Sequence, residues 1–255
     1  MTRAMTGETF GGGALRRPRV VGALAITLGG VAILLALMVW QIQRLGWKQD
    51  LIATLEARLS APPMALPETF APGTEEFRRV AVTGRFTGAE GGHGFTDVAR
   101  LVTLRPWGPG YRVIQPFETD EGRLLLVDRG YAPIAEKNVR AAAARPTPAP
   151  EGPVDLIAVL RWPDDSDYFA DPEAGARDNV WLTREVEALA PLWGAEPVLL
   201  VAETDTAVGD WPRPAPVTVD LPNDHLEYAI TWGSLAAVWA AMGAVLIRRE
   251  ARRGA

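Results

Sequence analysis

The residues best suited to chemistry stand near the carboxyl end of the chain. His225, Tyr228 and Trp232 occupy positions i, i+3 and i+7, so a helix would carry them on one face. Trp239 would extend the same face. A neutral imidazole is a good ligand for haem iron, and aromatic rings can flank a porphyrin. The pattern is also typical of a histidine that caps or packs a helix start beside ordinary membrane-interface aromatics. The spacing leaves both interpretations open.

A second polar group follows the first apolar stretch of the chain. Gln41, Arg44 and Lys48 also share one helical face. Arg44 and Lys48 could bind the propionates of a haem, because both cations pair with carboxylates. They could equally bind the phosphates of membrane lipid. The two cations are therefore candidates for cofactor binding or for lipid contact.

Few residues suit other chemistries. The chain has no cysteine, which excludes covalent haem attachment, thiolate metal sites and disulfides. Its five methionines form no cluster, so a copper site built on sulfur is not expected. With only two histidines, His93 and His225, and no G-x-S-x-G, P-loop or H-E-x-x-H motif, the sequence offers no catalytic constellation. We interpret Gly91–Gly94 and Asp164–Asp167 as turns, and we expect no catalytic residues and no enzyme.

Two uncharged stretches must position these residues. Val20–Trp40 and Ala229–Ile247 are each about 20 residues long, which matches the roughly 30 Å hydrocarbon core of a bilayer. A cleaved signal peptide is disfavoured for the first stretch, because the apolar run is long and no small-x-small site follows it. We predict two transmembrane helices.

Charge at the two ends predicts the orientation of these spans. Residues 1–19 and residues 248–255 each hold four arginines and one glutamate. The positive-inside rule then places both termini in the cytoplasm and exports residues 41–228, to the periplasm if the membrane is a bacterial inner (plasma) membrane. Between the two basic tails the chain holds 18 basic and 29 acidic residues. Such an acidic body argues against nucleic-acid binding, which needs a basic surface.

Small residues recur along both predicted spans. Small faces let helix backbones approach closely in lipid, so we predict that the two spans pack on each other. The alternative is that glycine and alanine are simply common in membrane helices. The residues concerned are Gly22, Ala25, Gly29, Ala32 and Ala36 in the first span, and Ala229, Gly233, Ala236, Ala240 and Gly243 in the second.

The residues between the spans predict one α+β domain with an antiparallel sheet, curved or barrel-like. Leucines recurring every four residues indicate a helix over Leu45–Leu59, ended by Pro62-Pro63. A second helix is predicted over Val180–Leu192, and Ala141–Pro153 is expected to be an exposed loop. The predicted strands are Phe77–Phe86, Tyr111–Phe117, Arg123–Tyr131, Val154–Trp162 and Val198–Ala202.

Several blocks in a fixed order resemble the surfeit locus protein 1 family along most of the chain. The first is W-Q-x-Q-R-L-x-W-K-x-x-L-I over Trp40–Ile52, and the last is P-N-D-H-L-E-Y-A-I-T-W over Pro222–Trp232. Between them lie Arg79–Phe86, Gly110–Phe117, Leu126–Pro133, Asn179–Trp181 and Gly194–Pro197.

The resemblance implies a two-span cytochrome c oxidase assembly factor that binds haem a and aids its insertion into oxidase subunit I. It further implies that His225 is the haem-iron ligand. Tyr228, Trp232, Arg44 and Lys48 are then the remaining candidates for haem contact. The alternative is a scaffold that binds oxidase subunits or haem a synthase without holding haem.

Three residues depart from the family pattern. Met38 stands where a glycine is usual, which would weaken a close helix contact. Asp128 stands where an asparagine is usual. Glu227 stands where a glutamine is usual and would bring a charge near a bound haem. None of the three removes the ligand that the resemblance implies.

Overall fold

The structure is a computed structural model that describes residues 18–92, 95–134, 147–163 and 179–253. The chain forms two compact units, one made of Met1–Ile52 and Asp220–Ala255 and the other of Ala53–Val219. His93 and the predicted turn Asp164–Asp167 lie outside the described residues, as do residues 141–146 of the predicted loop Ala141–Pro153.

Two long helices make up the described part of the first unit. Helix α1 (Pro18–Ser60) is continuous over 43 residues, and helix α6 (His225–Arg252) covers 28. Both helices are long and apolar enough to cross a membrane. At 1.5 Å per residue α1 is about 65 Å long, roughly twice the thickness of a hydrocarbon core. The helix predicted over Leu45–Leu59 is therefore confirmed as the continuation of the first apolar stretch.

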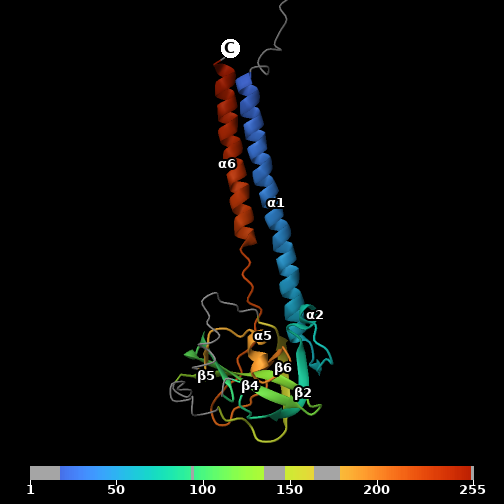
Figure 1. Ribbon diagram of the computed structural model, residues 1–255. Helices are drawn as coiled ribbons and strands as arrows, with labels where there is room; N and C mark the ends of the chain where they lie inside the picture. The colour runs from blue at the N-terminus through green and yellow to red at the C-terminus, as the bar shows by residue number, and fades with distance from the viewer. Residues whose placement is uncertain (1–17, 93–94, 135–146, 164–178, 254–255) are drawn as a thin grey trace, which may run out of the picture. The chain divides into compact units, whose positions relative to one another are not determined.

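Helices α1 and α6 run antiparallel beside each other (Figure 1). Side-chain contacts join them along their length. Residues at seven-residue intervals on α6 are buried, namely Ala229, Ala236 and Gly243. This interval is typical of left-handed helix pairs, in which one narrow seam of each helix faces the other. The buried residues that α1 contributes from its apolar stretch are Val20, Ala23 and Thr27, and Gln41 follows at its end.

Close approach in this seam depends on glycine. A Cβ built at Gly243 would overlap the Thr27 side chain, and one built at Gly30 would overlap the Trp239 ring. A Cβ at Gly233 would lie 3.0 Å from the Sδ of Met38. Met38, expected to weaken the contact between the helices, thus fills the space that Gly233 leaves.

The prediction that the two spans pack on each other is confirmed, but the face predicted for α1 is wrong. A Cβ at Gly22 or Gly29 would meet nothing within 4 Å, and Ala25, Ala32 and Ala36 are exposed. The physical reason is that only one helix of a pair needs small residues for close approach. Here α6 supplies most of the small residues, and the α1 face that contacts α6 carries larger side chains.

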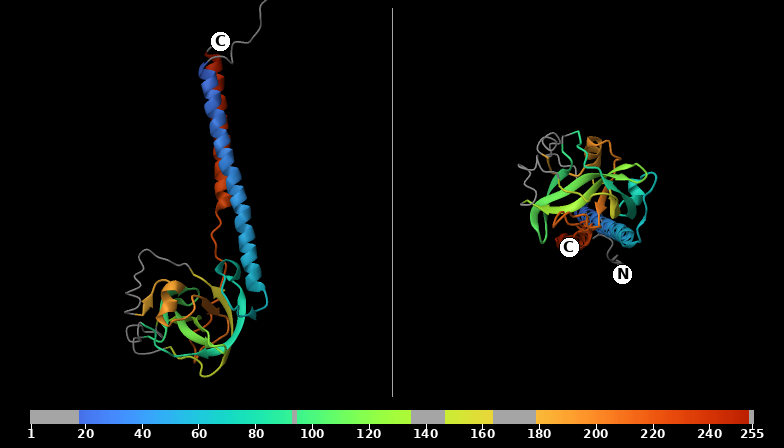
Figure 2. Two further views of the ribbon diagram at one scale, coloured as in Figure 1. Left: turned by 45° about the vertical axis from the view of Figure 1, so that its right-hand side comes forward. Right: turned by 90° about the horizontal axis from the view of Figure 1, so that it is seen from below.

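The second unit is built on a closed five-stranded barrel. The strands follow the order β2-β6-β8-β5-β4, and an additional pairing of β2 with β4 closes the ring. These strands are β2 (Arg79–Phe86), β4 (Gly108–Thr119), β5 (Leu124–Pro133), β6 (Val154–Arg161) and β8 (Leu199–Ala202). Short strands β1 (Met64–Ala65) and β7 (Val180–Trp181) and strand β3 (Val98–Leu104) extend the sheet. Figure 2 shows the green and yellow strands curving round one another.

Residues on the two faces of strand β5 belong to different cores. Leu125 and Val127 pack with Val80 and Phe117, whereas Leu126 packs with Ile114. The second core also takes in Val186 and Leu189 of α5 (Val186–Leu189) and Ala190 of the short helix η2 (Ala190–Leu192). A strand covered on both faces reads as a continuous apolar run, which is why Leu124–Val127 does not alternate.

The five predicted strands match the five barrel strands with ends shifted by up to three residues, but the sheet is mixed rather than antiparallel. Strand β8 pairs antiparallel with β6 and parallel with β5. A closed ring with an odd number of strands cannot alternate direction throughout, so one neighbouring pair must be parallel. The helix predicted over Val180–Leu192 is also wrong at its start, because Val180 and Trp181 form β7.

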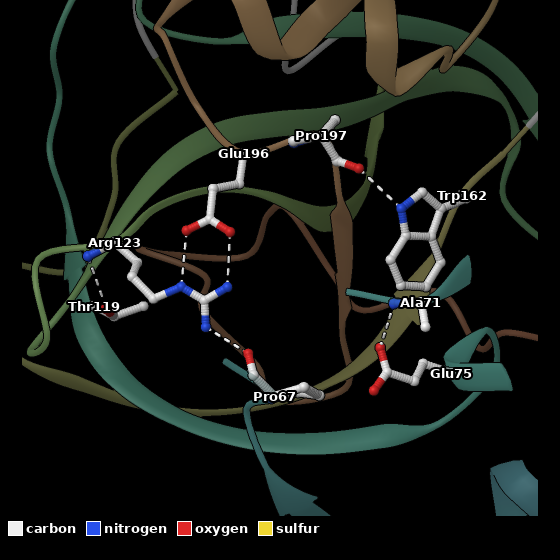
Figure 3. A network of polar contacts seen from close by, with 8 residues as sticks. All are labelled: Pro67, Ala71, Glu75, Thr119, Arg123, Trp162, Glu196 and Pro197. Carbon is white, nitrogen blue, oxygen red and sulfur yellow. Dashed lines mark hydrogen bonds and ion pairs between the residues drawn. The ribbon is translucent and has the colours of Figure 1, made fainter. Parts of the chain in front are cut away.

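An arginine ties the segment before β2 to the barrel (Figure 3). The Arg123 guanidinium donates to both carboxylate oxygens of Glu196, over 2.8 and 2.7 Å, and to the carbonyl of Pro67. The hydrogen bond to Glu196 raises the pKa of Arg123 above its ordinary value. The guanidinium also lies 4.7 Å from the centre of the Phe70 ring. This single side chain therefore fixes both the segment around Pro67–Phe70 and the residues that lead into β8.

Two buried arginines of the barrel unit have different partners: Arg112 pairs with a carboxylate, and Arg129 donates to neutral acceptors. The Nε of Arg112 donates to Asp128 over 2.5 Å, and the two side chains are 8% and 0% exposed. Arg129 is fully buried and donates to Thr206, Gln115 and Pro148. Burial lowers the pKa of Arg129 to about 10, so the side chain stays charged at neutral pH. Asp128, which stands where the family usually has asparagine, is thus balanced by Arg112.

We predict that Gly243→Ala disrupts the helix pair. The added methyl group would meet Thr27, a β-branched side chain whose hydroxyl already donates to the Ala23 carbonyl over 2.7 Å. Overpacking of this kind costs about 1–3 kcal/mol. Because the chain has no cysteine, oxidative cross-linking of a Met38→Cys, Gly233→Cys pair measures helix contact directly. The yield should fall several-fold in Gly243→Ala and stay unchanged in Gly29→Ala, whose added methyl meets nothing. Equal yields in the two variants would contradict the seam.

We predict that Asp128→Asn destabilises the barrel unit although it installs the residue usual in the family. The amide would leave the buried Arg112 without a counter-charge, at a cost of about 1–3 kcal/mol. Urea unfolding followed by tryptophan fluorescence should show a lower midpoint for this variant. Asp155→Asn is the matched control, because Asp155 is exposed and accepts a hydrogen bond from Thr83. A shift in the control as large as in Asp128→Asn would show that burial is not the cause.

Candidate functional site

Helix α6 begins at His225. Pro222 precedes it by three residues, and Asp224 stands at the N-cap with φ −91° and ψ 9°. The Asp224 side chain makes no capping hydrogen bond, but its carbonyl accepts from the Tyr228 N–H over 3.2 Å. Glu227 lies in the first turn, where a negative charge is favourable. His225 is therefore the first helical residue and does not serve as the cap.

The His225 ring is joined to α1 by a side-chain hydrogen bond. Its Nδ1 lies 2.7 Å from the Oε1 of Gln41. Gln41 is only 7% exposed, and His225 is half-buried. A glutamine so deeply buried needs a hydrogen-bond partner, and the histidine provides it. His225 thus packs against α1 at the start of α6 and makes its hydrogen bond through Nδ1.

Gln41 and His225 lie where both apolar stretches end. Gln41 directly follows the uncharged run Val20–Trp40, and His225 stands four residues before Ala229, where the second uncharged run begins. In a bilayer the pair would lie at the boundary between hydrocarbon and water. Lipid on one side and water on the other suit a ligand that has both an apolar and a charged part.

The aromatic residues predicted to share a face with His225 differ in their surroundings. Trp232 is half-buried and lies seven residues after His225, whereas Tyr228 is 55% exposed. Trp239 reaches α1, where its Nε1 donates to the Ile26 carbonyl over 3.4 Å. His225, Trp232 and Trp239 therefore follow the side of α6 nearest α1, and Tyr228 lies at its margin.

Arg44 and Lys48 continue the α1 face that carries Gln41. The Arg44 guanidinium lies 4.9 Å from the centre of the Trp47 ring, and Arg44 is exposed. Lys48 is half-buried. Within the described residues neither cation makes a hydrogen bond or an ion pair with His225. Both stay available to an anionic group such as a propionate or a lipid phosphate.

Two polar residues of the site had no predicted role beside His225. The sequence places Gln41 on a polar face with Arg44 and Lys48. Its pairing with His225 depends on the register of α1 against α6, and no short motif encodes that register. The Oδ1 of Asn223 is buried and has no hydrogen-bond partner among the described residues. A buried acceptor without a donor costs about 1–3 kcal/mol, so a donor brought by a ligand or partner would be stabilising there.

The similarity to known proteins covers the barrel unit and parts of both long helices. The SURF1 family model matches residues 28–237, which include Gln41 and His225. The SURF1-like protein of Monosiga brevicollis is 35% identical over 224 residues, which cover 84% of this chain and 83% of that protein. Surfeit locus protein 1 of Homo sapiens is 35% identical over 209 residues, covering 78% and 68%. The SURF1-like protein of Drosophila melanogaster is 32% identical over 211 residues.

Proposed function

We propose that this protein acts in the assembly of cytochrome c oxidase. The chain belongs to the SURF1 family. Members of this family are known as cytochrome c oxidase assembly factors. That family is an assembly-factor family and not a known enzyme family. The partners proposed for this chain are oxidase subunit I and haem a synthase.

We propose that the chain spans the inner (plasma) membrane twice. The basic residues of the tails at 1–19 and 248–255 would hold both termini in the cytoplasm. Residues 41–228, which include the barrel unit, would then lie in the periplasm. The lengths and compositions of α1 and α6 support this arrangement.

Within this role we propose that the protein carries haem a to oxidase subunit I. The observation that carries the proposal is the hydrogen bond between Gln41 and His225, which fixes an imidazole where the apolar stretches of two helices end. His225 would ligate the haem iron, because neutral imidazole is a common axial ligand. The prenylated tail of haem a would be solvated by lipid.

The remaining contacts follow from residue chemistry around His225. Tyr228 and Trp232 lie on α6 within two turns of His225 and would flank the porphyrin. Arg44 and Lys48 carry positive charge on the α1 face beyond Gln41 and would pair with the propionates. The protein's part is to bind and orient the haem and to release it to subunit I.

The test is the optical spectrum of detergent-purified protein from cells that make haem a. The wild-type protein should carry haem a, and His225→Ala should lose most of it because the iron loses its ligand. His93→Ala is the matched control, since His93 is the only other histidine in the chain. An unchanged spectrum in His225→Ala overturns the ligand assignment. A wild-type protein without haem that still cross-links to subunit I would instead indicate a scaffold.

A further inference from the structure

We infer that Gln41 is a positioning residue that holds His225 in the tautomer protonated on Nδ1, which leaves Nε2 as the nitrogen that ligates iron. The inference rests on the proposed function for the identity of the metal. The tautomer of His225 itself is a property of the haem-free protein as well.

The chemistry of the two groups determines where the proton lies. The atom that faces Nδ1 is an amide oxygen, which accepts hydrogen bonds and cannot donate one. Over 2.7 Å the imidazole must therefore be the donor, with its proton on Nδ1. In a neutral imidazole the other nitrogen then keeps its lone pair. That nitrogen, Nε2, is the one free to bind a metal.

Burial makes the interaction specific to one glutamine. Gln41 is in the helix seam, whereas Gln43, two residues later on the same helix, is exposed. Because the Gln41 side chain is buried, water competes little for its amide, and the hydrogen bond orients the ring.

A partner of this kind usually matters for ligand strength. Histidines that bind metals generally donate their other ring N–H to an acceptor, which fixes the tautomer and raises the basicity of the ligating nitrogen. Removal of such an acceptor costs about 10–100-fold in metal affinity. Gln41 would play this part for His225, and it would do so from the other helix of the pair. Haem affinity would thereby depend on the register of α1 against α6.

The first experiment reads the tautomer without haem. In a His93→Gln background His225 is the only histidine, so ¹⁵N-histidine labelling of the full chain in detergent gives one pair of ring signals. At mildly alkaline pH the Nδ1 signal should be of the protonated type and the Nε2 signal of the unprotonated type. Gln41→Leu should shift both signals toward a mixture of tautomers, and Gln43→Leu should leave them unchanged. A protonated Nε2 in the parent protein, or no shift in Gln41→Leu, overturns the inference.

The second experiment measures haem affinity by titrating the same purified proteins with haem a. Gln41→Leu should raise the Kd about 10–100-fold. Gln41→Glu should restore affinity, because a carboxylate also accepts from Nδ1, and Gln43→Leu should have no effect. If His225→Ala weakens binding and Gln41→Leu does not, the inference fails and the proposed function stands. If His225→Ala leaves binding unchanged, the proposed function fails, and the ring signals alone then decide the tautomer.

Discussion

The register of the two long helices is the constraint on which the candidate site depends. Helix α1 is one uninterrupted helix from Pro18 to Ser60, so its seam residues have a fixed spacing relative to Gln41. Helix α6 starts at His225 and buries one residue every seven. Contact between Gly243 and Thr27 at one end of the pair therefore determines which side chain meets His225 at the other. The Gln41–His225 pair lies some 20 Å or more along the helices from this contact, at about 1.5 Å per residue. Apolar packing at one end thus aligns a polar pair at the other.

Closure of the barrel follows a comparable rule in the second unit. Five strands in a ring require at least one parallel pair, and here β8 provides it by lying between β6 and β5. Side-chain contacts hold the chain that leads into β8. Arg123 pairs with Glu196 just before the strand, and the Trp162 indole donates to the Pro197 carbonyl over 2.9 Å.

Sequence patterns predicted the elements whose signal is local. The uncharged run Val20–Trp40 and the alternation in Phe77–Phe86 need no knowledge of neighbours, and both are found as a helix and a strand. Strand β3 (Val98–Leu104) was missed, because its half-buried surface is defined by its pairing with β4. The His225–Gln41 contact joins residues 184 positions apart and could not be derived from any spacing. The α1 face that contacts α6 could not be derived from spacing either. The stripe of small residues that includes Gly22 and Gly29 predicted the opposite face.

The unequal lengths of the helices leave part of one α1 face without α6 beside it. Past Gln41, α1 continues for 19 further residues, whereas α6 has already ended at His225. The α1 face that α6 covers up to Gln41 is then no longer covered by α6, and that face presents Arg44 and Lys48. Had α6 begun two turns earlier, its side chains would occupy this position. A histidine on the first residue of the shorter helix therefore combines a ring hydrogen-bonded to Gln41 with a neighbouring cationic surface, a combination that would suit the haem binding proposed above.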